Sequence, residues 1–301
     1  MKPIKVDLSA DFEEIKVVPV GDYHLGDPQS DYKKIMSDLT YIKDNENVFC
    51  CVLGDVMNTA IKSSVSNCYG ETLTPMEQLQ ECEKLFAPVR DKILCIVPGN
   101  HERRIARETS IDTTHLFAKQ LGIEDRYSPT TALVFLRFGR LEVGNHKRKA
   151  LYTIHVSHGS GGGRKEGGKI QRLVDLSGIV DADCYICGHT HLPAILKERF
   201  IRPSAANSSL TYCDKLYVNT SAKLEYGGYG DYGGFKPAST DTPIIIFSGS
   251  KKRNEGGAIV PKEVLETVER IVALGKEAIV KKERGKWVVI ENGKRLVYKE
   301  P

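Results

Sequence analysis

The chain has 301 residues, of which 41% are hydrophobic and 27% charged, and 43 basic against 39 acidic side chains give a net charge of +4. These proportions are typical of a globular protein with a sizeable core, and they exclude collagen-like, coiled-coil and wholly disordered chains. No apolar run approaches the roughly 18 residues of a transmembrane helix, and the N-terminus lacks the apolar stretch of a signal peptide. We therefore expect a cytoplasmic protein without membrane association.

Short apolar runs rich in β-branched residues recur along the first two thirds of the chain, and each is followed by a polar turn that contains glycine. Near-continuous hydrophobicity is typical of strands that are covered on both faces. The runs are Ile15–Val20, Val48–Leu53, Ile93–Val97, Leu151–Val156 and Cys184–Cys187.

Amphipathic helices are predicted between the first three of these strands. Ser30 or Asp31 can cap a helix that begins near residue 32. Thr74, followed by Pro75 and Glu77, has the signature of a capping box at the start of a second helix. Strands that alternate with helices indicate an α/β protein with βαβ units and a mostly parallel central sheet.

The pattern changes after about residue 200. Strands are predicted at Leu216–Val218 and Pro243–Phe247, and the stretch between them, Tyr226–Phe235, is rich in Gly and Tyr and is expected to be a mobile loop. A large domain is thus predicted over residues 1–250.

A linker and a small separate appendage are predicted in the last fifty residues. Residues 251–257 have the composition of a linker, and residues 258–301 are expected to form a small α+β appendage. This appendage would consist of a helix at Lys262–Ala278 and a hairpin that turns near Asn292 and Gly293.

The eight cysteines are expected to be reduced, because most of them lie in apolar or helix-like stretches where free cysteine behaves as a small hydrophobic residue. Cys184 and Cys187 form a Cys-x-x-Cys pair, but no second such pair or matching Cys/His pair completes a tetrahedral zinc site. Core packing is therefore favoured over redox or metal chemistry for these thiols.

Polar residues with ligand chemistry follow each of the five predicted strands. Because the carboxyl ends of strands in an open α/β sheet share one edge, these residues are expected to converge there. The segments are Gly21-Asp22-Tyr23-His24, Gly54-Asp55, Gly99-Asn100-His101-Glu102, His158-Gly159 and Gly188-His189-Thr190-His191.

Carboxylate, amide and imidazole groups without sulfur suit Mn, Fe, Zn, Ni or Co. One ion would not need so many ligands, whereas two ions that share a carboxylate would use all of them. The Asp-x-His and His-x-His spacings also fit, because alternate residues of an extended segment point the same way.

Each of these residues has a simpler explanation when it is taken alone. An Asp or Asn after a strand is usually a turn residue, and a single buried His is often a packing residue. The joint occurrence at five strand ends, each beside Gly, outweighs that explanation. The other three histidines, His115, His146 and His155, are expected to be structural, with a supporting role near the site open for His155.

This series of motifs resembles the calcineurin-like metallophosphoesterase superfamily over roughly residues 15–250. Val218-Asn219-Thr220-Ser221 is similar to the Asn-Pro-Gly-Ser segment that often follows the last motif there, with a departure at Thr220-Ser221. The resemblance implies a β-sandwich with flanking helices, strands mostly parallel near the site, and a dinuclear metal centre.

The resemblance also implies a role for each residue. Asp22, His24 and His191 would hold the first metal, Asn100, His158 and His189 the second, with Asp55 bridging both, and His101 would be the catalytic imidazole. The cofactors would be two divalent ions, with Mn2+ expected first and Fe, Zn, Ni or Co as alternatives. Such a pair lowers the pKa of a bridging water, so that hydroxide attacks the phosphate ester, while His101, held by a carboxylate such as Glu102 or another neighbour, stabilises the developing charge or protonates the leaving group.

Basic residues near these motifs bear on the substrate. The segment from Arg137 to Arg172 holds nine basic and two acidic residues, a net charge of +7, which indicates either a solvated basic face or a polyanion site. Tyrosines at 226, 229 and 232 offer stacking surfaces for bases. The candidate substrate-binding residues are Arg103, Arg104, Arg164, Lys165 and Lys169, with Arg107 a further candidate.

These features favour a nuclease-like phosphodiesterase that acts on DNA, RNA or nucleotides. Asp22-Tyr23-His24-Leu25-Gly26 resembles the first motif of the Mre11/SbcD-type nucleases, but Asn58 stands where those enzymes commonly carry a second catalytic histidine. Glu102 in Gly-Asn-His-Glu is frequent among protein phosphatases, so a phosphomonoesterase acting on phosphoprotein or a nucleotide stays open. A catalytically silent protein-binding scaffold is the third alternative, since fold does not fix function.

Overall fold

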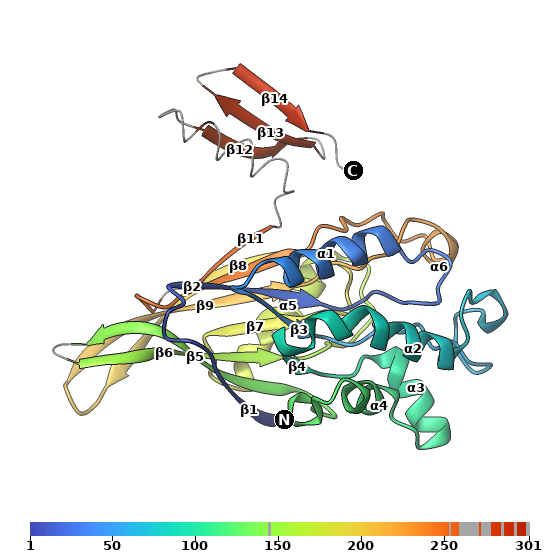
Figure 1. The fold of residues 1–301 in the computed structure, drawn as a ribbon, viewed down its shortest axis with the longest axis horizontal. Helices are drawn as coiled ribbons and strands as arrows, with labels where there is room; N and C mark the ends of the chain where they lie inside the picture. The colour runs from blue at the N-terminus through green and yellow to red at the C-terminus, as the bar shows by residue number, and fades with distance from the viewer. Residues whose placement is uncertain are drawn as a thin grey trace. The chain divides into compact units, whose positions relative to one another are not determined.

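Strand pairing in the computed structural model divides the predicted strands between two sheets (Figure 1). The structure describes residues 1–143, 146–252, 254–258, 271, 278–283, 286–291 and 294–298. Two compact units are distinguished, residues 1–257 and residues 258–301. All predicted site residues belong to the first unit.

One sheet of the first unit contains the first three predicted strands, in the order β11-β10-β2-β3-β4. Strands β2, β3 and β4 run parallel, with β4 at one edge, and β10 pairs antiparallel with β2. The bounds are β2 Glu14–Val20, β3 Val48–Val52, β4 Ile93–Ile96, β10 Pro243–Ser248 and β11 Asn254–Ala258.

The other sheet has the order β1-β5-β6-β7-β9-β8. Strands β6, β7 and β9, whose ends lead to the site, run parallel, whereas β5 pairs antiparallel with β6 and β8 antiparallel with β9. The bounds are β1 Lys2–Asp7, β5 Ala132–Val143, β6 His146–Val156, β7 Cys184–Cys187, β8 Ala194–Ser204 and β9 Ser209–Asn219.

The five motif-bearing strands therefore do not share one sheet, and that expectation is wrong. β2, β3 and β4 belong to one sheet and β6 and β7 to the other, because apolar residues on the facing sides of both sheets bury each other in a common core. Leu53 and Val97 come from the first sheet, and Val156 and Ile186 from the second. The expected α/β sandwich with flanking helices is confirmed.

Helices cover the outer faces of this sandwich. α1 packs near β3, and α5 packs through Leu173 on Tyr185 and Tyr217 of the second sheet. The helices are α1 Tyr32–Asp44, α2 Pro75–Phe86, α3 Asn100–Thr109, α4 Thr113–Gln120, α5 Glu166–Asp175 and α6 Gly228–Tyr232, with 3-10 turns at Cys68–Gly70, Ala87–Lys92, Glu124–Arg126 and Leu176–Gly178.

The predicted helix caps are present. The side chain of Asp31, rather than Ser30, accepts a hydrogen bond from the backbone N–H of Lys34 at the start of α1. At α2, Thr74 and Glu77 form the reciprocal capping box. These caps satisfy backbone donors that the first turn of a helix leaves unpaired.

Two segments differ from their expected conformation. Residues 251–257, expected as a linker, include part of strand β11, where buried Asn254 donates from Nδ2 to the backbone oxygen of Asp183 at 2.9 Å. The expected loop Tyr226–Phe235 contains the short helix α6. Pairing at the edge of a sheet gives the first segment a fixed place that its composition does not reveal.

The second unit contains a three-stranded antiparallel sheet of β12 Ala278–Glu283, β13 Lys286–Glu291 and β14 Lys294–Tyr298. Glu291 pairs with Lys294, as the predicted hairpin requires. The predicted helix Lys262–Ala278 lies outside the described residues, apart from positions 271 and 278.

The cysteines are free thiols, six of them buried, as expected. Cys184 and Cys187 are interior residues of β7. In the part of the chain that the structure describes, no helix combines the length and the apolar character needed to cross a bilayer.

Candidate metal centre

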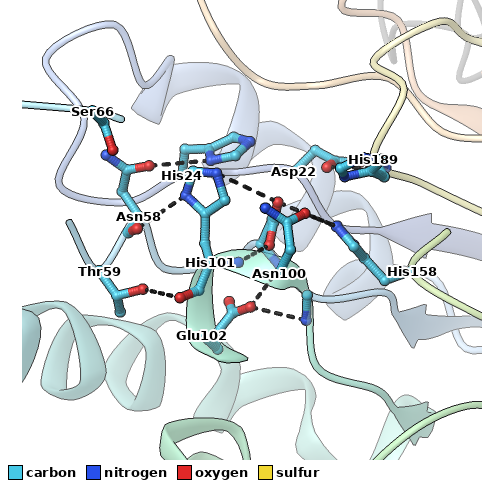
Figure 2. Close-up of polar contacts among 12 residues, drawn as sticks. Asp22, His24, Asn58, Thr59, Ser66, Asn100, His101, Glu102, His158 and His189 are labelled. Atoms are coloured by element: carbon cyan, nitrogen blue, oxygen red, sulfur yellow. Dashed lines mark hydrogen bonds and ion pairs between the residues drawn. The ribbon is translucent and has the colours of Figure 1, made fainter. Parts of the chain in front are cut away.

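Side chains from the ends of both sheets meet at one end of the sandwich (Figure 2). Three groups of possible metal ligands have their ligand atoms within 4.8 Å of one another. The groups are Asp22, His24 and His191; Asp55, His158 and His189; and His24, Asp55 and His101. The structure thus brings together the carboxylates and imidazoles that the sequence predicts as ligands.

The first group lies where β2 ends. Asp22 is fully buried, and its carboxylate accepts from the backbone N–H of His189 at 2.9 Å. Its Oδ1 also lies 3.4 Å from Nε2 of His191. The two Nε2 atoms of His24 and His191 are 3.3 Å apart, so both nitrogen lone pairs can bind the same cation.

The second group lies between the two sheets. His158 Nε2 is 3.2 Å from Asp55 Oδ2 and 2.9 Å from Asn100 Oδ1. His158 Nδ1 lies 2.8 Å from the backbone oxygen of Leu53, so Nδ1 carries a proton and Nε2 is the ring nitrogen that faces the site. The amide oxygen of Asn100, the first residue of α3, therefore lies beside the ligand atoms of this group.

Asp55 belongs to two of the groups and sits between the predicted metal positions. It is 1% exposed. Its Oδ1 accepts from the backbone N–H of His101 at 2.8 Å, and its Oδ2 faces His158 and His101. This placement is the one that a carboxylate shared by two cations requires.

The ligand loops adopt backbone conformations that most residues avoid. Asp22, His24, Asp55, His189 and His191 all have positive φ, between 48° and 67°. A non-glycine residue in this left-handed region carries strain, which is commonly found at functional sites. The expectation that Asp22 and His24, or His189 and His191, alternate along an extended segment is therefore wrong, because both members of each pair are left-handed.

The glycines beside the ligands permit a close approach of two loops. Gly54 has φ +83°, and a Cβ there would lie 2.0 Å from the backbone nitrogen of Gly99. A Cβ on Gly99 would lie 2.0 Å from Oδ1 of Asp55. Only glycine at both positions lets the loops that carry Asp55 and Asn100 pack against each other.

Glu102 holds these two loops together. Its buried carboxylate accepts from the backbone N–H groups of Asp55, Met57 and Gly99, at 2.9, 3.0 and 2.9 Å. Burial, with the nearby charge of Asp55, raises the pKa of Glu102 to about 7, and the backbone donors oppose that rise. Of the carboxylates open for holding the His101 ring, Glu102 is not the one, because its carboxylate is used by the loop backbone.

His101 is instead held by the loop after β3. Its Nδ1 lies 3.0 Å from the backbone oxygen of Asn58, and its own backbone oxygen accepts from Thr59 Oγ1. Its side chain is 17% exposed, and Nε2 lies 3.8 Å from Asp55 Oδ2. The ring therefore presents Nε2 to the site.

The side chain of Asn58, a residue that the sequence analysis noted only as a departure, orients His24. Its Oδ1 lies 3.3 Å from His24 Nδ1, and its Nδ2 donates to Glu71 Oε1 at 2.5 Å. Gln78 Nε2 donates to the other carboxylate oxygen of Glu71. Asn58 Oδ1 thus accepts the Nδ1 proton and leaves Nε2 of His24 as the ligand atom.

Two further residues hold the loop that carries His189 and His191. Asn219 Nδ2 donates to Thr190 Oγ1 at 2.9 Å and to the backbone oxygen of Leu192 at 2.7 Å. Lys169, predicted to bind substrate, donates from Nζ to the backbone oxygen of Thr190 at 2.8 Å. Asn219 had a signal in the sequence, the Val-Asn-Thr-Ser segment.

Burial and neighbouring charges shift the pKa values of His24 and His158 in opposite directions. Burial, together with the neighbouring His101, lowers the pKa of His24 to about 3, so its ring is neutral. Burial also opposes a charge on His158, but the Asp55 carboxylate raises the pKa of His158 to about 9. His158 lowers the pKa of Asp55 well below its usual range against the effect of burial. The concentration of acid and imidazole groups is suited to a cation, which would replace this ion pair.

The predicted substrate-binding residues lie on different sides of the site. On α3, Arg104 Nη1 donates to Ser66 Oγ at 3.0 Å and interacts with the charges of Asp55 and Glu102. Arg164 lies over the Phe235 ring, 5.3 Å from its centroid. Lys165 is exposed at the start of α5.

Much of the basic run from Arg137 to Arg172 is neutralised by acidic residues. Arg137 and Lys149 pair with Asp7, and Arg140 pairs with Asp11 at 2.6 Å. These acidic partners lie far away in the sequence. On β5 and β6, the interpretation as a solvated face is therefore favoured over the polyanion site.

The remaining histidines and the tyrosines complete the placement. His115 lies 2.9 Å from Glu124 on the surface, and His155 is a buried β6 residue whose ring lies near Tyr185, so neither is at the metal centre. Tyr226 and Tyr232 are exposed. The side chain of Tyr229 lies outside the described residues.

Comparison with known proteins gives a family. Residues 15–193, more than half of the chain, match the family model described as calcineurin-like phosphoesterase. No curated protein sequence matches significantly. The family assignment thus comes from this match and agrees with the residues gathered at the strand ends.

Several solved structures are similar to the chain. A predicted phosphoesterase from Streptococcus pneumoniae has 13% identity and a TM-score of 0.32, covering 82% of this chain and 98% of its own. A double mutant of Vps29 from Entamoeba histolytica has 11% identity and a TM-score of 0.35, covering 95% and 100%. Wild-type Vps29 from the same organism, complexed with zinc, has 12% identity and a TM-score of 0.32, covering 81% and 98%.

Proposed function

Because the chain belongs to the calcineurin-like phosphoesterase family, we propose that it is a dinuclear-metal-dependent phosphodiesterase that acts on nucleic acids or nucleotides. The observation that carries this proposal is the position of Asp55, which has one carboxylate within ligand distance of imidazoles on both sides. A purely structural role would not require four imidazole rings around one buried carboxylate.

The donor set fits two divalent cations. Asp22, His24 and His191 would hold one, and Asp55 would be shared with a second that is held by three further residues, Asn100, His158 and His189. Oxygen and nitrogen donors without sulfur suit Mn2+, Fe, Zn2+, Ni or Co, and Mn2+ is our first choice. Bound there, the ions would supply Lewis-acid polarisation of the phosphate and would lower the pKa of water.

His101 is suited to proton transfer. The backbone oxygen of Asn58 accepts from Nδ1, which leaves Nε2 free at the edge of the site. When the ring is protonated, Nε2–H can donate to the developing charge on a phosphate oxygen or to the leaving alkoxide. The partial exposure of the ring gives a substrate access to this atom.

The substrate class is supported by the residues around the site. Arg104 lies on the same helix as His101, and the loops that carry Arg164 and Phe235 meet through a cation–π contact and through an ion pair between Lys236 and Glu166 at 2.9 Å. Exposed Tyr226 and Tyr232, in the segment that precedes Phe235, offer stacking surface. Charge with aromatic surface suits an anionic ester that carries bases.

We expect Asn58→Ala to weaken Mn2+ binding by about 10- to 100-fold, because His24 loses the acceptor that fixes its Nδ1 proton. Isothermal titration of the metal-free protein with Mn2+ measures the affinity. Asn47→Ala, a change at a partly buried asparagine that donates to the backbone oxygen of Glu14 and not to a predicted ligand, is the matched control. An affinity equal to that of the control would remove Asn58 from the metal centre.

The test of the proposed function is a substrate panel. The purified protein, stripped with a chelator and reloaded with Mn2+, should hydrolyse a chromogenic phosphodiester together with labelled DNA, RNA or cyclic nucleotides, and the stripped protein should not. Hydrolysis of phosphomonoesters alone would replace the proposal with a phosphatase. Hydrolysis of none of these by a protein that binds Mn2+ would favour a binding scaffold.

A further inference from the structure

A cavity beside helix α3 presents two arginine side chains on the helix that begins at the metal centre. Its volume is about 290 Å3, close to the lower end of the range for small-ligand sites, about 300 to 1,000 Å3. We call this cavity the α3 pocket. Its lining residues are Pro98, Arg103, Ala106, Arg107, Asp112 and Pro129.

The α3 pocket contains two guanidinium groups and one carboxylate, so its formal charge is positive. In the described part of the chain, neither the Arg103 nor the Arg107 guanidinium makes an ion pair or a side-chain hydrogen bond, and like charges four residues apart on a helix repel each other. The carboxylate of Asp112 accepts from the backbone N–H of His115 and from the hydroxyl of Tyr127 rather than from either guanidinium. By contrast, Arg137 and Arg140 on β5 both have carboxylate partners.

The chemistry of the lining selects a phosphate-bearing ligand. Guanidinium groups recognise phosphate through two parallel N–H···O bonds, and a pair of them offsets the charge of a phosphate group more fully than one. The side chains of Pro98, Ala106 and Pro129 add apolar surface beside the two charges. A sugar or base attached to the phosphate can contact that surface.

The position of the pocket relates it to the metal centre. Arg103 and Arg107 lie two and six residues beyond His101, about 3 and about 9 Å along the helix axis and about 200° and about 240° around it, so they face away from the side that carries His101. Arg104, on another side of the same helix, turns toward Ser66 and the metal centre. A ligand that reaches from His101 to the pocket must therefore extend past the reacting phosphate and around α3, which a nucleic-acid strand can do and a small ester cannot.

From these observations we infer that the α3 pocket binds a phosphate group of a nucleic-acid strand, at a distance along the strand from the phosphate that is hydrolysed. This inference rests on the proposed phosphodiesterase function and narrows its substrate to a polynucleotide. The pocket would hold the strand by one distant phosphate, so its contribution is to affinity for long substrates.

The test compares two double variants with the same change in charge. Arg103→Glu/Arg107→Glu alters the α3 pocket, and Lys147→Glu/Arg148→Glu alters the β5–β6 hairpin, which lies at the other end of the first unit (Figure 1). Binding of a fluorescein-labelled single-stranded phosphorothioate oligonucleotide to the Mn2+-loaded full chain is followed by fluorescence anisotropy over a series of salt concentrations. Arg103→Gln/Arg107→Gln removes the charge without reversing it, and circular dichroism checks the fold of each variant.

We expect the α3 double reversal to raise the Kd about tenfold more than the hairpin reversal. The slope of log Kd against log salt should fall by about 0.7, the value for one phosphate of a single strand. The neutral Gln variant should show the same reduction in slope. Equal effects of the two reversals would overturn the inference, because the oligonucleotide would then sense only the total charge.

The outcomes separate this inference from the function on which it rests. If the wild-type protein hydrolyses the chromogenic diester but binds the oligonucleotide no better than the α3 variant does, the inference fails and the phosphodiesterase stands. If no ester is hydrolysed and the α3 reversal still weakens oligonucleotide binding selectively, the pocket stands and the proposed catalysis fails.

Discussion

Replacing Asp55 by Asn is expected to reduce kcat/KM for Mn2+-dependent phosphodiester hydrolysis by about a thousandfold or more, which corresponds to about 4 kcal/mol. The amide keeps the size of the side chain and an oxygen for the backbone N–H of His101. It removes the negative charge that faces both groups of ligands. A neutral oxygen is a weak ligand for two cations at once, so their affinity and their separation should both change.

Metal content and rate must be measured on the same Asp55→Asn preparation. Metal analysis after dialysis should show fewer than two ions per chain, and the rate should follow that loss. Asp91→Asn, at an exposed aspartate, makes the same chemical change away from the site and serves as the control. A variant at position 55 with full activity would rule out the shared-carboxylate centre.

His101→Ala is expected to lower kcat by about 10²- to 10⁴-fold while both ions stay bound, because it removes a proton donor and leaves the predicted ligands in place. The backbone N–H of residue 101, which donates to Asp55, is unaffected by the change. Metal analysis and steady-state kinetics on the same sample separate the two effects.

The structure makes this experiment decisive for the role of His101. Its ring belongs to a group with His24 and Asp55 whose ligand atoms lie within 4.8 Å, so a role as a ligand is geometrically available. Loss of an ion from His101→Ala would show that role and contradict catalysis by a free imidazole. His115→Ala, at a surface histidine paired with Glu124, controls for the loss of an imidazole.

The parts of this molecule that were predictable from sequence are those that local chemistry determines. Buried strands such as β3 and β7 show as continuous apolar runs, and the capping box at Thr74 shows as three residues. Asp22 and Asp55 were recognisable because each follows a strand beside glycine. That these residues lie close together was predicted from the assumption that the carboxyl ends of the strands share one edge.

The division into two sheets was not determined by any local pattern. β4 and β6 are both apolar strands, and only their pairing partners assign them to different sheets. The ligand residues that follow these strands nevertheless lie close together, because the ends of the two facing sheets lie side by side. The predicted cluster of ligands therefore forms between two sheets and not at the edge of one parallel sheet.

The supporting contacts were also hidden in the sequence. The loop from Asn58 to Glu71 places a carboxylate behind His24 across thirteen positions with no regular spacing. Left-handed φ values at five ligands leave little signal in the sequence, because Asp and His, although enriched in this region among non-glycine residues, adopt other conformations at most positions. Such features arise from tertiary packing.

The position of the ligands at the end of a sandwich has a consequence for the apolar side chains between the two sheets. Leu53 lies two residues before Asp55 and Val156 two before His158, and both side chains belong to the apolar layer between the sheets. That layer is a spacer whose thickness sets the gap between the carboxylate and the imidazole. Interiors pack too tightly to absorb an added methylene without movement. Changes of side-chain volume in this layer would thus alter the distance between Asp55 and His158, and with it the metal centre.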